Sequence, residues 1–136
     1  VSYIVLQKDI RKYEEIAVKF FRKLIPFAKL FNESARHVEI DDHFFFKGAP
    51  VAIVIVSKAS INGALAASNM PLMAESHGLG VLYSGFFSIV LQYSRKLRKY
   101  FKLHHKDKVV ITLVIGYPRV KYYRTTQKYK AKVLHL

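Results

Sequence analysis

The sequence contains no cysteine and few acidic side chains. Without cysteine, no disulfide can form within the chain, and no iron–sulfur cluster or zinc ion can be held by its thiolates. This composition fits a cytoplasmic protein. Long apolar runs are also missing, because no stretch reaches the roughly 18 residues that cross a bilayer, and no segment resembles a signal peptide. We therefore expect no membrane partner.

Signatures of common enzyme classes are absent too. The sequence has no glycine-rich Walker loop, no Rossmann glycine fingerprint, no HExxH motif and no GxSxG elbow. His104 and His105 are adjacent, so their rings diverge, as is typical of a surface pair rather than a metal site. Asp41 and Asp42 are suited to acid–base work, but adjacent carboxylates in a loop are more often turn formers or helix caps. We assign no metal ligand and no catalytic side chain.

The length of 136 residues, about half of them hydrophobic, is sufficient for one domain with a real core, and we predict a single domain over residues 1–136. The net charge is +14, and the cations concentrate after Ser94, where only Asp107 opposes them. Such a basic field attracts polyanions and steers phosphorylated ligands, but an ordinary solvated lysine-rich surface has the same composition. The chain starts at Val1 without methionine on what reads as an interior strand. We therefore expect an N-terminal segment to be absent from this sequence.

Apolar periodicity predicts the secondary structure. Strands are expected at residues 2–7, 51–56 and 109–115, and helices from about residue 10 to 25, then at 61–77, 86–93 and 95–101. Pro26 should end or kink the first helix near Ile25, and Pro71 should bend the second. Gly78 suits a left-handed helix stop. Residues 32–50 read as a loop anchored by three phenylalanines, and the apolar residues 131–136 as a strand added to a sheet edge of this or a partner subunit.

Two short segments have the chemistry to hold a flat phosphorylated ring. Tyr83, Ser84 and Gly85 form a turn, and a glycine lets the backbone come within hydrogen-bonding distance of such a ring. Arg124, with Lys121 near it, offers cations that match phosphate. By themselves these features are more often an ordinary turn and solvated cations than a binding site. A flavin suits such a chain, because it carries the redox chemistry and requires the protein only to hold, orient and tune it.

Three segments taken in order carry a family resemblance: residues 45–55 (FFKGAPVAIVI), residues 64–80 with their alanines and closing glycines, and residues 116–124 (GYPRVKYYR). Together they resemble the C-terminal part of the nitroreductase-like FMN-dependent oxidoreductases, in the ferredoxin-associated, clostridial-like branch. The resemblance implies an α+β fold with a mixed β-sheet flanked by helices. It also implies an intertwined homodimer with an exchanged C-terminal tail and with FMN at the subunit interface. Tyr83, Ser84 and Gly85 would lie along the isoalloxazine, and Arg124, with Lys121, would contact the phosphate.

The resemblance further implies that a reduced nicotinamide or a similar donor reduces FMN, which then passes electrons to a nitroaromatic, a quinone or a related acceptor. The sequence departs from the family pattern in two respects. Relatives normally place an arginine-rich helix and an asparagine-containing loop before the strand that begins here near Ser2, and neither is present in these residues. Asn62 stands where an acidic residue is common.

Two alternatives remain open at this point. The basic, tyrosine-rich residues 95–132 would suit a nucleic-acid-binding module, because aromatic rings among cations can stack on exposed bases. No RNP, KH or helix-turn-helix signature supports this alternative, so nucleic acid is not the partner we expect. The chain would instead be a non-catalytic remnant of the flavoenzyme fold if it keeps the architecture but has lost the cofactor.

Overall fold

One β-sheet organises the computed structural model, which describes residues 1–31, 38–121, 123 and 128–134. Its strands are β1 (Ser2–Leu6), β2 (Val51–Ser57), β3 (Gly80–Tyr83) and β4 (Lys108–Gly116), in the spatial order β1–β2–β4–β3. All three strand pairs are antiparallel. The predicted α+β class is confirmed, whereas the parallel pairing of a mixed sheet is not found among the described strands.

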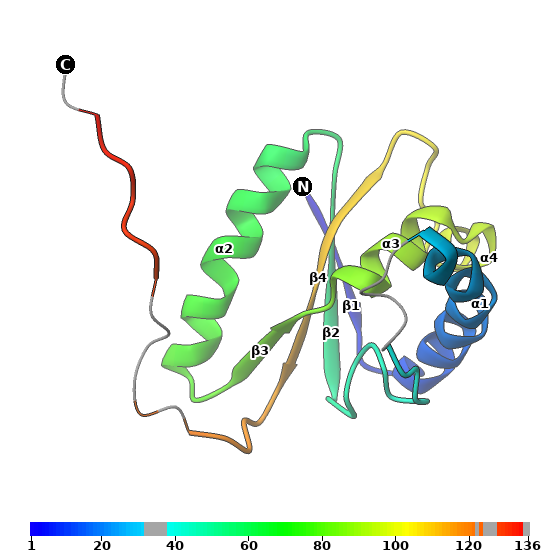
Figure 1. Ribbon diagram of the computed structural model, residues 1–136, viewed down its shortest axis with the longest axis horizontal. Coiled ribbons are helices and arrows are strands. Elements are labelled where there is room, and N and C mark those ends of the chain that lie inside the picture. Colours follow the sequence, from blue (N-terminus) through cyan, green and yellow to red (C-terminus); the bar gives the residue numbers. More distant parts are fainter. Residues whose placement is uncertain (32–37, 122, 124–127, 135–136) are drawn as a thin grey trace.

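Helices cover both faces of the sheet (Figure 1). They are α1 (Ile10–Phe31), α2 (Ser60–Ser76), α3 (Gly85–Tyr93) and α4 (Arg95–Tyr100). Helix α2 lies alone on one face, and α1, α3 and α4 share the other. The main core lies on the three-helix side, and a smaller cluster of Ile55, Ala67 and Leu113 lies beneath α2. This arrangement explains why β2 reads as a continuous apolar run, since neighbouring residues of a strand point to opposite faces and both faces are covered.

The predicted strands and helices are found with small shifts at their ends, and one strand is new. Residues 80–83, read from the sequence as a short apolar segment, form β3, which pairs with β4 from Gly80 opposite Gly116 to Tyr83 opposite Leu113. Gly78 has a φ of 72° and is the left-handed residue that follows α2, as predicted.

Pro26 does not end α1, which continues to Phe31, and α2 runs through Pro71, whereas a kink at Pro26 and the bend at Pro71 remain predictions. A proline inside a helix leaves the carbonyl four residues earlier without its amide partner. For Pro71 that carbonyl belongs to Ala67, and the Tyr83 hydroxyl donates to it at 3.3 Å. Pro26 is exposed to solvent, so water can satisfy the corresponding carbonyl of Arg22. The lost hydrogen bonds are thus replaced, and neither helix ends early.

The predicted aromatic anchor is confirmed in the loop before β2. Phe45 and Phe46 are each 1 % exposed, and their rings pack against Phe87 of α3 with centroids 5.7 and 4.6 Å away. The loop is therefore part of the core. It connects α1, α3 and the start of β2.

The described part of the C-terminal tail, residues 128–134, extends away from the body of the molecule without regular secondary structure (Figure 1). Val133 and Leu134 are largely exposed there. The predicted extra strand at residues 131–136 remains a prediction, and its last two residues lie outside the described part. Among the helices that are described, none is both long and apolar enough to cross a membrane.

Candidate functional site

The turn between β3 and α3 is fixed to the sheet by Ser84. Its backbone N–H donates to the Thr112 carbonyl at 2.8 Å, and its side chain is buried. Ser88 strengthens the same junction, because its hydroxyl donates to the Thr112 hydroxyl at 2.9 Å and to the Ser84 carbonyl at 3.2 Å. The backbone amide of Ser84 is therefore already used within the fold. Ser84 anchors the turn, and the groups open to a ligand belong to the residues around it.

Gly85 begins α3 and presents open backbone. The first amides of a helix have no intrahelical acceptor, and those of residues 85–87 have none among the described residues. A Cβ built on Gly85 would meet no atom within 4 Å. Leu82 and Phe86 beside it are about half exposed. Phe87 is fully buried, so the turn combines two accessible unpaired donors, the amides of Gly85 and Phe86, with an open, largely apolar approach.

Tyr83 joins this turn to α2. Its ring is about half exposed, while its hydroxyl is held by the Ala67 carbonyl that Pro71 leaves without an amide partner. The hydrogen bond fixes the phenol at its far end and leaves part of the ring surface open. Tyr83, Ser84 and Gly85 therefore lie together, as predicted from the sequence. What they contact in a complex remains a prediction.

A cavity of about 300 Å³ lies at the other end of β3, where β4 finishes. Because a strand rises about 3.3 Å per residue, the start of β3 is about 10 Å from its end at Tyr83. The walls of the cavity are mostly apolar and come from three segments of the chain. The lining residues are Phe46, Lys47, Ala49, Gly80, Val81, Leu82, Val114, Gly116, Tyr117, Pro118, Arg119 and Val120.

Two cations line this cavity, and both were missed as site residues from the sequence. Lys47 is already engaged, with its Nζ 3.3 Å from the Asp41 carboxylate and 5.2 Å from the ring centroid of Phe44. Arg119 is exposed and has no ion-pair partner among the described residues. It is therefore the cation at the cavity that is open to an anionic ligand.

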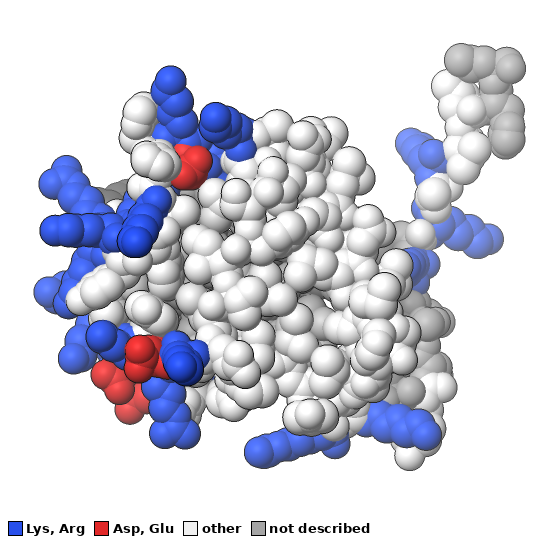
Figure 2. Space-filling model, turned by 180° about the vertical axis from the view of Figure 1, so that it is seen from behind, with Lys and Arg blue, Asp and Glu red and all other residues white. Residues whose placement is uncertain are grey.

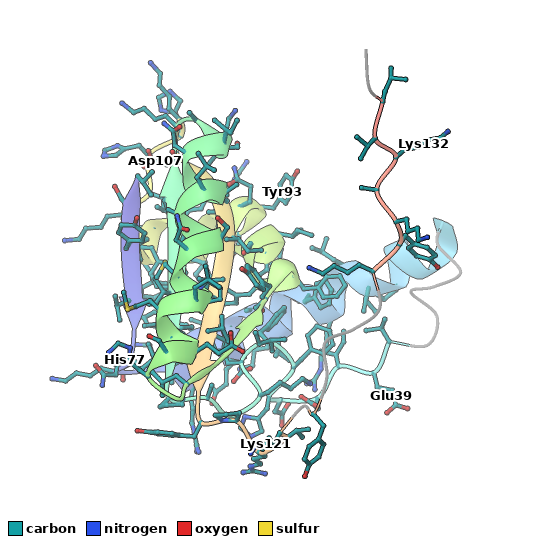
Figure 3. All side chains as sticks on the ribbon, turned by 90° about the vertical axis from the view of Figure 1, so that its left-hand side faces the viewer. Glu39, His77, Tyr93, Asp107, Lys121 and Lys132 are labelled. Carbon is teal, nitrogen blue, oxygen red and sulfur yellow. The ribbon has the colours of Figure 1, made fainter. Side chains whose placement is uncertain are left out.

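The predicted phosphate contacts are placed only in part. Lys121 is exposed and lies beyond the end of the sheet at which β4 finishes, the same end as His77 (Figure 3). It therefore belongs to the cavity end of β3. Arg124 lies outside the described residues, so its assignment remains a prediction.

The pairing of β2 with β4 would have identified Lys47 and Arg119 as site residues from the sequence. Val51, at the start of β2, pairs with Ile115, near the end of β4. The Lys-Gly-Ala-Pro segment before β2 and the Gly-Tyr-Pro-Arg segment after β4 therefore meet. The contact is close, because a Cβ on Gly116 would lie 3.4 Å from the Ala49 Cβ. An antiparallel assignment of the two confident strands would have brought both cations to one place.

The basic region proposed from the sequence is divided in space. Lys and Arg side chains gather on the side of the molecule where α1 and α4 lie, while the C-terminal tail carries other cations away from the body (Figure 2). Tyr100 of α4 is occupied by neighbours, since Lys12 lies 5.7 Å from its ring centroid and Tyr13 packs on its edge. This division weakens the case for one continuous nucleic-acid surface. Within the described residues, no group of three or more His, Asp or Glu side chains is placed to hold a metal ion.

Comparisons with known proteins place the chain in a family. A family model described as the nitroreductase family matches residues 1–117. The fold is similar to that of a nitroreductase with bound FMN from Bacteroides fragilis, with 18 % identity, a TM-score of 0.70, and coverage of 99 % of this chain and 74 % of that one. An FMN-dependent nitroreductase from Clostridium difficile gives 16 % identity, a TM-score of 0.70, and coverage of 99 % and 77 %.

A third similar structure is an oxidised iodotyrosine deiodinase bound to FMN and 3-iodo-L-tyrosine. It has 17 % identity and a TM-score of 0.62, and the match covers 98 % of this chain and 76 % of that one. No curated protein sequence matches significantly. At such low identities the structural likenesses establish the fold alone. The family model, by contrast, spans both the turn at Gly85 and the strands that border the cavity. The chain belongs to the nitroreductase family.

Proposed function

We propose that the protein is an FMN-dependent oxidoreductase that works as a homodimer. A reduced nicotinamide or a similar donor delivers electrons, which pass to a nitroaromatic, a quinone or a related acceptor. One observation carries the proposal: a strand of the sheet connects a cavity with an open cation to a turn with unpaired amide donors. Flavins require this combination, because the ring needs donors at its edge and the phosphate needs positive charge.

The described residues fit part of an FMN site. The amides of Gly85 and Phe86 would hold the edge of the ring, and the half-exposed Tyr83 and Leu82 would flank it. Arg119 and Lys121 would hold the phosphate, joined by Arg124 if the tail follows the family pattern. Ligand pockets usually enclose about 300–1,000 Å³, so a cavity of about 300 Å³ suits a half-site completed by other protein segments.

When bound, FMN supplies the electron-transfer chemistry itself. The side chains of this protein then have three tasks. Val81 and Val114, which are half-buried and buried, would keep water from the inner wall of the cavity. Ser84 and Thr112 keep the turn rigid, so that the amides of α3 stay aimed at the ring edge without reorganisation. Arg119 balances the charge of the phosphate.

Helix α2 supports the homodimer. It carries no charged residue before Glu75, and its outer surface exposes Ile61, Leu65, Leu72 and Met73, each by more than 60 %. Several large apolar side chains on one exposed surface are typical of a protein–protein contact. We propose that α2 packs against a second copy and that the tail of each chain is exchanged, as in the family pattern. The isolated chain offers nothing else to cover this surface within the described residues.

The test is a titration of the purified protein with FMN, followed by quenching of flavin fluorescence and by the visible absorbance of protein separated from free flavin. Stoichiometric retention of FMN would support the proposal, and subsequent bleaching by a reduced nicotinamide would identify the donor class. A folded dimer that never retains FMN would instead identify the non-catalytic remnant. Tight binding of an oligonucleotide that weakens steeply with added salt would favour the nucleic-acid alternative.

A further inference from the structure

Helix α1 carries a buried acidic residue that the proposed function does not use. Glu14 is 3 % exposed, in a helix whose other charged side chains with described positions face solvent. Its Oε1 accepts from the backbone N–H of Phe45 at 3.1 Å and from that of Phe46 at 2.7 Å. Its Oε2 lies 3.7 Å from Nδ1 of His43. Burying a carboxylate costs free energy unless it is hydrogen-bonded. These three contacts therefore stabilise the buried carboxylate and fix residues 43, 45 and 46 of the loop relative to α1.

Glu14 holds the loop that becomes one wall of the cavity. Phe46 donates its amide to Glu14 and accepts at its carbonyl from the Ala49 amide, at 2.9 Å. Phe46 and Ala49 both line the cavity. Between them Lys47 and Gly48 have φ values of 51° and 75°, a tight left-handed turn that depends on fixed ends. The position of Phe46 therefore sets the position of the whole wall.

Phe46 also reaches the turn with the open amides. Its ring packs against that of Phe87 with centroids 4.6 Å apart, and Phe87 lies in the first turn of α3. Phe87 is itself fully buried and directly follows Gly85 and Phe86, whose amides are the open donors of the turn. A single carboxylate on α1 is thus connected through one residue to both halves of the candidate site.

We infer that Glu14 is a positioning residue, which through Phe46 sets the cavity wall and the start of α3. The step from Glu14 to these two structural elements depends on the geometry alone. The step from there to FMN affinity rests on the proposed function.

The test compares Glu14→Ala with Val18→Ala. Val18 is 2 % exposed in the core, one helical turn away on α1, and makes none of these hydrogen bonds, so its truncation supplies a general loss of stability for comparison. Hydrogen exchange of individual amides is measured well below the unfolding transition of both variants. We expect Glu14→Ala to speed exchange at residues 45, 46 and 88, whose amides are hydrogen-bonded, by about tenfold or more, as loss of a charged acceptor implies, while Val18→Ala does not selectively speed exchange at these three residues.

The FMN dissociation constant is measured on the same folded samples. Glu14→Ala should raise it by about tenfold, and Glu14→Gln, which keeps an acceptor oxygen, should restore most of the affinity. If Glu14→Ala does not fold, Glu14→Gln is compared with the wild type instead. A smaller acceleration of exchange at the same amides is then expected. Equal changes in Val18→Ala, or exchange that stays slow at residues 45 and 46, would overturn the inference. If the wild type binds no FMN, the proposed function fails, and the exchange pattern still decides whether Glu14 positions the wall.

Discussion

Helices α1 and α2 lie on opposite faces of the same sheet, yet their outer surfaces differ in kind. The outer surface of α1 carries the charged residues Arg11, Lys12, Glu15, Lys19, Arg22 and Lys23. The outer surface of α2 instead exposes Ile61, Leu65, Leu72 and Met73. A helix whose apolar side chains are buried needs no further cover, whereas large apolar side chains gathered on an exposed surface are typical of a contact with another protein. The outer surface of α1 is therefore suited to solvent, and that of α2 to the proposed subunit contact.

The largest effect is expected from charging the outer side of α2. Leu65→Glu combined with Leu72→Glu should convert the proposed dimer to monomers, because burying a leucine contributes about 1.5–3 kcal/mol and two would together shift the dissociation constant at least about a hundredfold. Light scattering during size-exclusion chromatography measures the mass. Lys19→Glu combined with Lys23→Glu on α1 is the matched control and should leave the mass unchanged. A dimer that survives the α2 changes would place the subunit contact elsewhere.

The next effect concerns the cavity. Arg119→Ala should weaken FMN binding by about 1.5–3 kcal/mol, the usual value of a hydrogen bond to a charged group, which is about 10- to 150-fold in dissociation constant. Fluorescence titration measures it, and Lys19→Ala on α1 controls for the same loss of net charge. If the two variants bind FMN equally well, only the general basic field attracts the flavin, and Arg119 does not contact it.

An effect similar to or smaller than that of Arg119→Ala is expected from adding a side chain at Gly63, on the inner side of α2. A Cβ at Gly63 would lie 2.6 Å from Cγ2 and 3.1 Å from Cβ of Val110, so rotation of the valine cannot relieve the clash. Gly63→Ala should therefore lower the free energy of unfolding by about 1–3 kcal/mol, as overpacking usually does. Chemical denaturation measures this change. An unchanged unfolding midpoint would mean that α2 can move away from β4 at little cost.

The smallest effect is expected at Gly85. Because a Cβ there meets nothing within 4 Å, Gly85→Ala should change the free energy of unfolding by no more than about 0.5 kcal/mol. The same denaturation experiment measures it beside Gly63→Ala. A loss of stability as large as that of Gly63→Ala would show that the space at the turn is needed for folding, and would remove the reason to see it as an open approach for a ligand.

Local sequence patterns predicted the secondary structure correctly where the conformation of a segment depends only on its own residues. The continuous apolar run of β2 and the left-handed Gly78 both follow from neighbouring residues. Pro26 shows the limit of that reasoning, because α1 continues past it to Phe31. At Pro71 the Ala67 carbonyl accepts a hydrogen bond from the hydroxyl of Tyr83, twelve residues further along the chain, and no local pattern predicts this contact.

The candidate site was predicted only in part for the same reason. Tyr83, Ser84 and Gly85 are consecutive, so their proximity needed no tertiary information. Lys47 and Arg119 come together only through the pairing of β2 with β4, and composition alone gave them no distinction from other surface cations. Glu14 was equally hidden, because its role depends on a loop more than thirty residues away.

Strand β1 affects how readily the purified protein aggregates. It stands at one end of the sheet, so one row of its backbone amides and carbonyls has no neighbour among the described strands, and Tyr3 and Val5 are exposed beside that row. An edge of this kind recruits strands from other molecules. Concentrated solutions are therefore at risk of intermolecular sheet growth wherever no further segment covers β1, and a lysine in place of Tyr3 is the simplest protection.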